Sequence, residues 1–257
     1  MITHGDGLLA LRTLPADSAE LVFCDPDWNI GIGMDHEGGY KVGETTQNRE
    51  KGVPWWETEA FIGTLANGLR VAENIVFKFS GRADHMREIH RCVVTLEHPL
   101  LADVFTWDKG PGAPSGGNQG VSVNTESLWW FTRKDGRQRR LERTKAANPK
   151  NGPVFSWPNC SNIIRDHRVN QEKHATQHSC EVSPKLCEFV IKFFTVPGDT
   201  IIDPCCGSGV LLARALNLGR KVLGYELDAN HVAAARQVCA GSSTRIAGQQ
   251  GLFAETP

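Results

Sequence analysis

The stretch TIIDPCCGSG, residues 200–209, decides the fold of this chain. Its first four residues form a short apolar run after a proline and a glycine, which predicts a strand. Gly207 and Gly209 then predict a tight turn, and apolar residues at helical spacing over 211–216 predict a helix that ends near Gly219. A strand that enters a helix through a glycine-rich turn is typical of doubly wound α/β sheets, where such turns bind nucleotide-like ligands.

The next strand is predicted over residues 221–226 and closes on Glu226. An acid about 20 residues beyond such a turn accepts hydrogen bonds from ribose hydroxyls, so an adenosine moiety is indicated. A dinucleotide fingerprint places a third small residue where this chain has Leu212, which favours S-adenosylmethionine over NAD or FAD. The alternative is that Gly207 and Gly209 only make a tight turn.

The same alternation of strands and helices appears at both ends of the chain. Residues 21–24 predict a strand that a proline stops, residues 61–69 a helix and residues 74–79 another strand, which together make a βαβ pattern. A helix is predicted over about 184–195, after Ser183 and a proline, and Asp228 is expected to cap the last helix. Between these ends, the glycine-, proline- and charge-rich stretches predict an insert.

A second motif, DPDWNI at residues 25–30, follows the first predicted strand. Its place at the carboxyl end of a parallel strand is where such sheets put function. Carboxylate and carbonyl acceptors beside an aromatic ring suit reactions at an amino group of a nucleic-acid base. Such an amino group is a poor nucleophile because its lone pair is delocalised into the ring. Asp25 and the carbonyl of Pro26 can accept its two hydrogens, and Trp28 can stack on the base. Taken alone, the motif also fits a plain strand-ending turn.

Together the two motifs resemble the amino-methyltransferases of DNA, the adenine-N6 and cytosine-N4 family, in the circularly ordered class whose catalytic motif precedes the cofactor motif. The resemblance covers about half the chain, at both ends. Its residues are Gly5-Asp6-Gly7, Leu14-Pro15, 21–30, Ser183-Pro184-Lys185-Leu186, 203–209, Gly219-Arg220, Gly224 and Glu226. It implies an α/β fold: a Rossmann-like, S-adenosylmethionine-dependent methyltransferase sheet with a loop-rich insert.

The resemblance also implies roles for individual residues. Asp25 and Pro26 would accept the amine, Trp28 would stack on a flipped base, and Glu226 would hold the ribose. The methionine end of S-adenosylmethionine would lie against Asp203, Cys205, Gly207, Ser208 and Gly209. The resemblance further divides the chain into a catalytic half (1–107), an insert that recognises DNA sequence (108–175), a cofactor-binding half (176–240) and a tail (241–257).

Aspartate at position 25 favours adenine N6 as the acceptor, because the cytosine enzymes more often resemble a serine version. The family usually has a second proline where this chain has Asp27. Three alternatives therefore stay open: a cytosine-N4 DNA methyltransferase, an RNA adenine methyltransferase, and a nucleic-acid-binding module that has lost turnover.

Charge and composition point to a nucleic-acid partner and one main domain. The formal net charge of the 257 residues is only −1, yet residues 133–150 are strongly basic. There, Arg133, Arg137, Arg139 and Arg140 are expected to contact DNA phosphates, with a solvated loop as the alternative. No leader or membrane segment is evident, so a cytoplasmic location is expected.

The eight cysteines show no repeated metal-binding spacing, so no metal is expected. The nearest approach to a metal cluster is His174, His178, Cys180 and Cys187. Trp107, Trp129 and Trp130 suit either a base pocket or core packing, and core packing is favoured for at least two of them.

The end of the chain carries a possible docking peptide. Gly241-Ser242-Ser243 predicts a linker, and the QQGLF segment that follows resembles the peptide with which bacterial DNA-processing proteins bind the replication sliding clamp. Gln249, Leu252 and Phe253 are its key residues. Folding of the apolar pair back onto the protein's own surface is the alternative.

Overall fold

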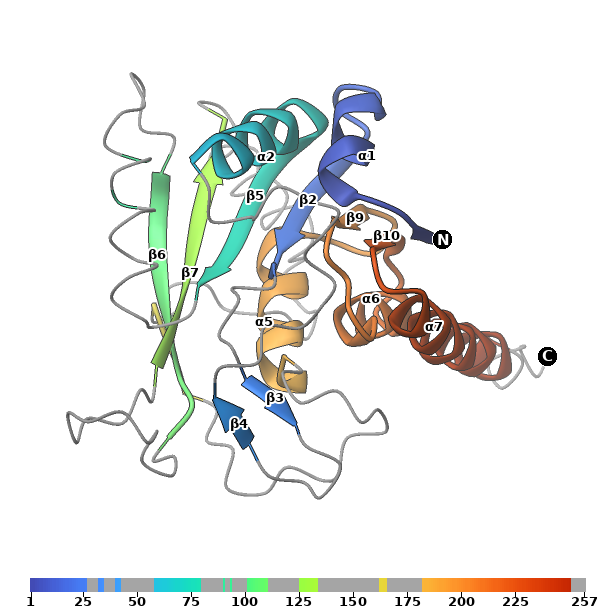
Figure 1. Ribbon diagram of the computed structural model, residues 1–257. Helices are drawn as coiled ribbons and strands as arrows, with labels where there is room; N and C mark the ends of the chain where they lie inside the picture. The colour runs from blue at the N-terminus through green and yellow to red at the C-terminus, as the bar shows by residue number, and fades with distance from the viewer. Residues whose placement is uncertain are drawn as a thin grey trace, which may run out of the picture.

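The computed structural model shows an α/β fold built on one mixed sheet of eight strands (Figure 1). It describes residues 1–26, 32–34, 40–42, 58–79, 90, 93, 101–110, 125–133, 162–165 and 182–250. The strand order is β1-β10-β9-β2-β5-β7-β6-β8, and a separate two-stranded ribbon pairs β3 with β4. The predicted α/β class with a Rossmann-like sheet is confirmed.

The strands of the large sheet are β1 (Ile2–His4), β2 (Ala19–Cys24), β5 (Ala72–Phe79), β6 (Leu101–Asp108), β7 (Thr125–Thr132), β8 (Ile163–Arg165), β9 (Thr200–Asp203) and β10 (Lys221–Glu226). The ribbon is β3 (Ile32–Met34) and β4 (Tyr40–Val42). Within the described sheet, β7 alone runs against the other strands.

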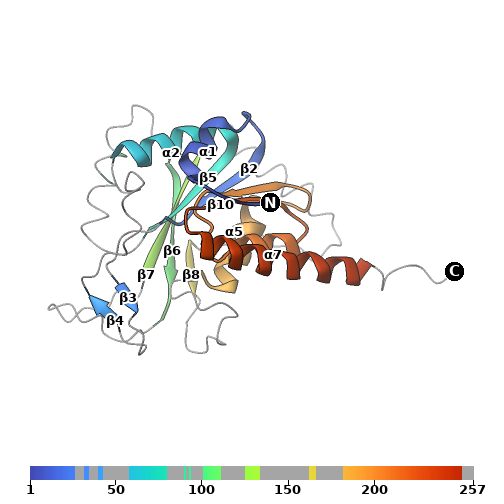
Figure 2. The same cartoon turned by 45° about the vertical axis from the view of Figure 1, so that its right-hand side comes forward.

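Helices cover both faces of the sheet, as both views show (Figures 1 and 2). Helices α1 (Gly7–Thr13) and α2 (Thr58–Val71) lie on one face, and α5 (Pro184–Phe194), α6 (Val210–Asn217) and α7 (Ala229–Gln250) on the other. Alternate residues of β2 divide between the two cores: Phe23 packs on the side of α5, and Val22 on the side of α2. Double coverage explains why β2 and β5 are buried along nearly their whole length.

The predicted strands and helices at the two ends are confirmed. Ser183 caps α5 by accepting the N–H of Leu186 at 3.1 Å, and Asp228 caps α7 through the N–H groups of Asn230 and His231. Gly209, with a φ of 78°, is the N-cap residue that precedes α6. Strand β1, which pairs with β10 at one edge of the sheet, was not predicted from the sequence.

The expectation that residues 108–175 are a loop-rich insert is wrong for residues 125–132. They form β7, an interior strand of the sheet that is hydrogen-bonded between β5 and β6. Leu128, Trp129, Trp130 and Phe131 are all buried in the two cores. The strand was not recognised because polar stretches precede and follow it in the sequence. Its apolar residues are continuous because helices cover both of its faces.

The linker expected at residues 241–243 is also wrong, because α7 continues through it to Gln250. Ser242 is buried, and its hydroxyl donates to the carbonyl of Val238 at 3.2 Å. A single glycine costs a helix only about 1 kcal/mol relative to alanine, so Gly241 does not end it. No helix among the described residues is long and apolar enough to cross a membrane.

Gly7 and Gly63 provide a matched pair for testing the contact between α1 and the glycine-rich turn. A Cβ at Gly7 would lie 1.9 Å from the carbonyl oxygen of Pro204, whereas one at Gly63 would find its nearest atom, in Leu8, at 3.8 Å. We expect Gly7→Ala to lower the free energy of unfolding by about 1–3 kcal/mol, because backbone must move to admit the methyl group. Gly63→Ala should be neutral or stabilise by about 0.5–1 kcal/mol, as expected in a helix. Urea unfolding of both variants measures this, and equal effects would contradict the assignment.

Candidate active site

The candidate site lies where the order of the strands reverses. From β9 the chain proceeds through α6 to β10 on one side, and from β2 it proceeds through α2 to β5 on the other. Strands β2 and β9 are parallel neighbours, with Leu21 opposite Ile201 and Val22 opposite Ile202. Their carboxyl ends therefore meet at one edge, and open α/β sheets bind their ligands in the crevice outside such a point.

The glycine-rich turn joins β9 to α6 at this edge. Asp203 ends β9 and accepts the N–H of Cys205 at 3.0 Å. Gly207 and Gly209 have φ values of 50° and 78°, which favour glycine. At Gly209 a Cβ would also lie 2.8 Å from that of Ala235 on α7, so packing excludes a side chain there. The sequence prediction that both glycines serve a tight turn is confirmed.

Glu226 ties the turn to the end of β10. Its Oε2 accepts the N–H of Gly207 at 2.9 Å, and its Oε1 accepts the N–H of Asp228 at 2.9 Å. Each carboxylate oxygen has a second lone pair that can accept a hydroxyl donor. The backbone thus fixes the carboxylate beside the turn, and its role in binding the ribose stays a prediction.

Three carboxyl groups gather at the ends of β2, β9 and β10, namely Asp25, Asp203 and Glu226. Burial raises the pKa of Asp203 well above its usual value, and the charges of Asp25 and Glu226 raise it further. Burial likewise raises the pKa of the Cys205 and Cys206 thiols. An excess of acidic groups suits a ligand that carries positive charge, and S-adenosylmethionine carries it on the sulfonium and the ammonium. The donor set therefore fits this cofactor.

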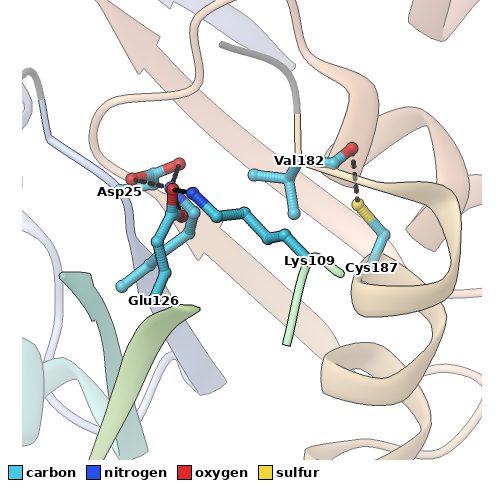
Figure 3. A network of polar contacts seen from close by, with 6 residues as sticks. Asp25, Lys109, Glu126, Val182 and Cys187 are labelled. Atoms are coloured by element: carbon cyan, nitrogen blue, oxygen red, sulfur yellow. Dashed lines mark hydrogen bonds and ion pairs between the residues drawn. The ribbon is translucent and has the colours of Figure 1, made fainter. Parts of the chain in front are cut away.

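Asp25 belongs to a network of alternating charges (Figure 3). Lys78 Nζ lies 3.0 Å from each oxygen of Asp25 and 2.8 Å from Oε2 of Glu126. Lys109 Nζ lies 2.6 Å from Oε1 of Glu126. The four side chains come from the ends of β2, β5, β6 and β7, and each is 10–18% exposed. Figure 3 shows Asp25 and Glu126 directed toward one another, with Lys109 reaching Glu126.

The pKa values in this network reflect burial opposed by the partner charges. Burial alone would lower the pKa of Lys78, but Asp25 and Glu126 raise it above its usual value. Burial would raise the pKa of Glu126, but Lys78 and Lys109 lower it. The partner charges therefore favour the ionised forms of Lys78 and Glu126.

Lys78, Lys109 and Glu126 were not predicted as site residues from the sequence. The available signal was Lys78 itself, because a lysine in the otherwise apolar run IVFKF of a buried strand requires a partner. The acids that pair with Lys78 could not be identified without β7, which was not predicted as part of the sheet.

The structure brings together most, but not all, of the predicted site residues. Asp25 and buried Pro26 lie at the end of β2, beside the turn that carries half-buried Cys205 and buried Ser208. Trp28 lies outside the described residues, as do Arg137, Arg139 and Arg140.

Arg133 lies away from this group. It directly follows β7, its backbone N–H donates to the carbonyl of Glu73, and its guanidinium forms an ion pair with Asp17. Along β7 it is separated from Glu126 by about 24 Å, at roughly 3.4 Å per residue.

The three tryptophans pack in the core. Trp107, Trp129 and Trp130 are at most 4% exposed, and Trp130 Nε1 donates to Oδ1 of Asn74 at 2.9 Å. Lys78 and Lys109 lie 6.0 and 5.8 Å from the centre of the Trp107 ring, a range at which cations interact with aromatic faces.

Cys187, from the group nearest to a metal cluster, is buried on α5. Its thiol lies 3.9 Å from the carbonyl of Val182 (Figure 3). The other three members of that group lie outside the described residues.

Fold and site together define a Rossmann-like methyltransferase. Residues 65–237 match the model of the N6/N4 DNA methylases, described as DNA methylase. This is more than half of the chain, which therefore belongs to that family and is an S-adenosylmethionine-dependent DNA methyltransferase.

Similar proteins span nearly the whole chain. Type II methyltransferase M2.DpnII of Streptococcus pneumoniae is 23% identical over 248 residues, covering 92% of this chain and 88% of that protein. M2.LlaDCHI of Lactococcus lactis subsp. cremoris is 24% identical over 246 residues, with the same coverage.

Solved structures share the fold. The PvuII DNA methyltransferase, described as cytosine-N4-specific, has a TM-score of 0.63 at 19% identity, covering 95% of this chain and 91% of its own. M1.HpyAVI in complex with S-adenosylmethionine has a TM-score of 0.58 at 19% identity, with 92% and 98% covered.

Proposed function

We propose that this chain methylates the exocyclic N6 amino group of adenine in DNA, with Asp25 as the group that accepts the amine. The observation that carries the proposal is the position of Asp25 at the end of β2, directly beside the glycine-rich turn that follows β9. The order of the two motifs along the chain favours the circularly ordered class. The similarity to proteins named type II methyltransferases favours a role in restriction and modification.

The chain's own residues would divide the work between the two sides of the switch point. S-adenosylmethionine supplies an activated methyl group when bound. On the β9 side, Glu226 would hold the ribose, and Asp203 and the turn would hold the methionine end. On the β2 side, Asp25 and the Pro26 carbonyl would accept the two amine hydrogens, which helps to localise the nitrogen lone pair. Trp28 is proposed to stack on the base.

Methylation of cytosine N4 is the second candidate, because the PvuII enzyme with the same fold is described as cytosine-N4-specific. Aspartate rather than serine at position 25 favours adenine. The two products differ in mass and chromatographic retention, so they are readily distinguished.

Nucleoside mass spectrometry of DNA from a methylation-deficient host expressing the chain tests the product. We expect N6-methyladenine with the parent and none with Asp25→Ala, because that carboxylate acts on the amine. Methylcytosine alone would show that position 25 does not set the base, and Asp25→Ala turnover within tenfold of the parent would contradict the role of Asp25.

Cofactor binding, measured by calorimetry on the same variants, supplies the matched control. Asp25→Ala should leave the S-adenosylmethionine Kd nearly intact, because Asp25 adds negative charge near the turn but is proposed to act on the amine and not on the cofactor. Glu226→Ala should weaken binding by roughly 10- to 100-fold, as expected for loss of a hydrogen bond to a charged group worth about 1.5–3 kcal/mol. An unchanged Kd in Glu226→Ala would remove its assignment to the ribose.

We also propose that Arg137, Arg139 and Arg140 contact DNA phosphates. Replacing all three by glutamine should reduce the slope of log K against log salt by roughly one per lost contact. Arg133→Gln is the comparison, since its ion pair with Asp17 and its distance from Glu126 predict a change well below the value of about one expected for a lost phosphate contact. An unchanged slope in the triple variant would favour a solvated loop.

The final proposal concerns the end of the chain, where Gln249, Leu252 and Phe253 would dock on the replication sliding clamp. Two adjacent apolar side chains suit a pocket, and tethering would raise the concentration of enzyme near newly made DNA. We expect the parent to recover the clamp in a pull-down and a Leu252→Ala, Phe253→Ala double variant to lose it. Equal recovery by both proteins, or by neither, would contradict docking.

A further inference from the structure

Lys78 makes an unusual set of contacts for a residue in a central strand. It lies near the carboxyl end of β5, which is buried along its length, and it is 10% exposed. Its ammonium group contacts both oxygens of Asp25 at 3.0 Å and Glu126 at 2.8 Å. One buried cation is thus shared between two carboxylates, one of which is the proposed amine acceptor.

Lys109 balances the remaining charge. Lys78 contacts Oε2 of Glu126, and Lys109 contacts Oε1. Negative and positive side chains therefore alternate from Asp25 to Lys109. If Lys78 were removed, Asp25 and Glu126 would face each other across a largely buried space without the cation that lies between them, and the ion pair described for Lys109 joins it to Glu126 and not to Asp25. Like charges in such a place favour protonation of one carboxylate.

An ionised Asp25 is what the proposed reaction requires. A neutral carboxylic acid has fewer lone pairs to offer and presents an O–H donor, which competes with the amine hydrogens. An amine that is gaining a methyl group develops positive charge, which a carboxylate stabilises and a neutral acid does not.

We propose that Lys78 is a positioning residue for methyl transfer, which holds the Asp25 carboxylate ionised and oriented while Glu126 and Lys109 hold Lys78 in place. The inference rests on the proposed role of Asp25. An ion pair between Lys78 and Asp25 that served only to stabilise the fold would contribute little, because apolar residues of similar volume stabilise a core as well as a buried ion pair does. The network instead lies at the carboxyl ends of the strands, where Asp25 keeps 18% of its side chain exposed.

Other ionisable groups act on the same site. Asp203 at the end of β9 interacts with Asp25, and so do the thiols of Cys24 on β2 and Cys187 on α5. Glu226 acts on Asp203 from β10. Apart from the thiols, these groups are acidic, so they add to the need for a cation beside Asp25; Asp27, the next residue, lies outside the described part of the chain.

The pH dependence of single-turnover methyl transfer tests the proposal, with the same DNA for every variant so that titration of the base is common to all. In Lys78→Met, the acid limb should move to higher pH by about one unit or more, the size of effect that an opposite charge at this range exerts. Lys78→Arg, which keeps the charge, should keep the limb within about 0.3 unit of the parent. The S-adenosylmethionine Kd should stay within about twofold in both, since the ion pairs described for Lys78 join it to Asp25 and Glu126 and not to the turn.

Two further variants separate this role from a structural one. Glu126→Gln should not raise the limb, because it removes a carboxylate that shares Lys78 with Asp25. Lys109→Met, at the outer end of the network, should raise it by less than Lys78→Met, and it serves as the test should Lys78→Met fail to fold. A limb that stays in place in both methionine variants, or a loss of rate that is equal at every pH, would overturn the proposal.

Failure of the two proposals would look different. Normal turnover in Asp25→Ala would contradict the proposed function itself. Loss of turnover in Asp25→Ala, combined with an unmoved acid limb in Lys78→Met and Lys109→Met, would contradict only the role given to Lys78.

Discussion

The parallel pairing of β2 with β9 is the constraint on which the rest of the structure depends. These strands come from opposite ends of the chain, and their register sets Val22 against Ile202. Neither motif can form a site alone, because the glycine-rich turn and the Asp25 segment meet only when these two strands align. Covering both faces with helices then excludes water from the sheet, which makes the register specific, since a shift by one residue would exchange the two cores.

That pairing creates an electrostatic problem. It brings Asp25 and Asp203 to one edge of the sheet, where Glu226 joins them from β10. Burial already favours the neutral form of Asp203. The carboxylates are stabilised by different groups on the two sides. On the β9 and β10 side, backbone N–H groups donate to them, whereas on the β2 side a lysine pairs with the carboxylate. Backbone donors leave room for a cationic cofactor, and a lysine secures the charge of one particular acid.

Local sequence patterns predicted the elements that position the site. The turn after β9, Glu226 at the end of β10 and the Ser183 cap of α5 all depend on residues close together in the chain, and all three are confirmed. The helix break at 241–243 was predicted wrongly because glycine and serine only weaken a helix, and Ser242 is buried in the structure. Propensity alone could not show that burial.

What the sequence could not predict was the partnership between distant strands. β7 was not recognised as part of the sheet because its neighbours, β5 and β6, are separated from it by polar stretches, and antiparallel pairing has no signature at such distances. As long as β7 was not placed in the sheet, the sequence indicated neither a partner for Lys78 nor a role for Glu126. The two motifs are thus determined by local sequence, whereas the charge of the proposed catalytic acid depends on the register of β7. That register pairs Phe79 with Ser127, which places Glu126 at the end of β5. The one reversed strand among those described makes this possible, because its amino end, rather than its carboxyl end, lies at the active edge of the sheet.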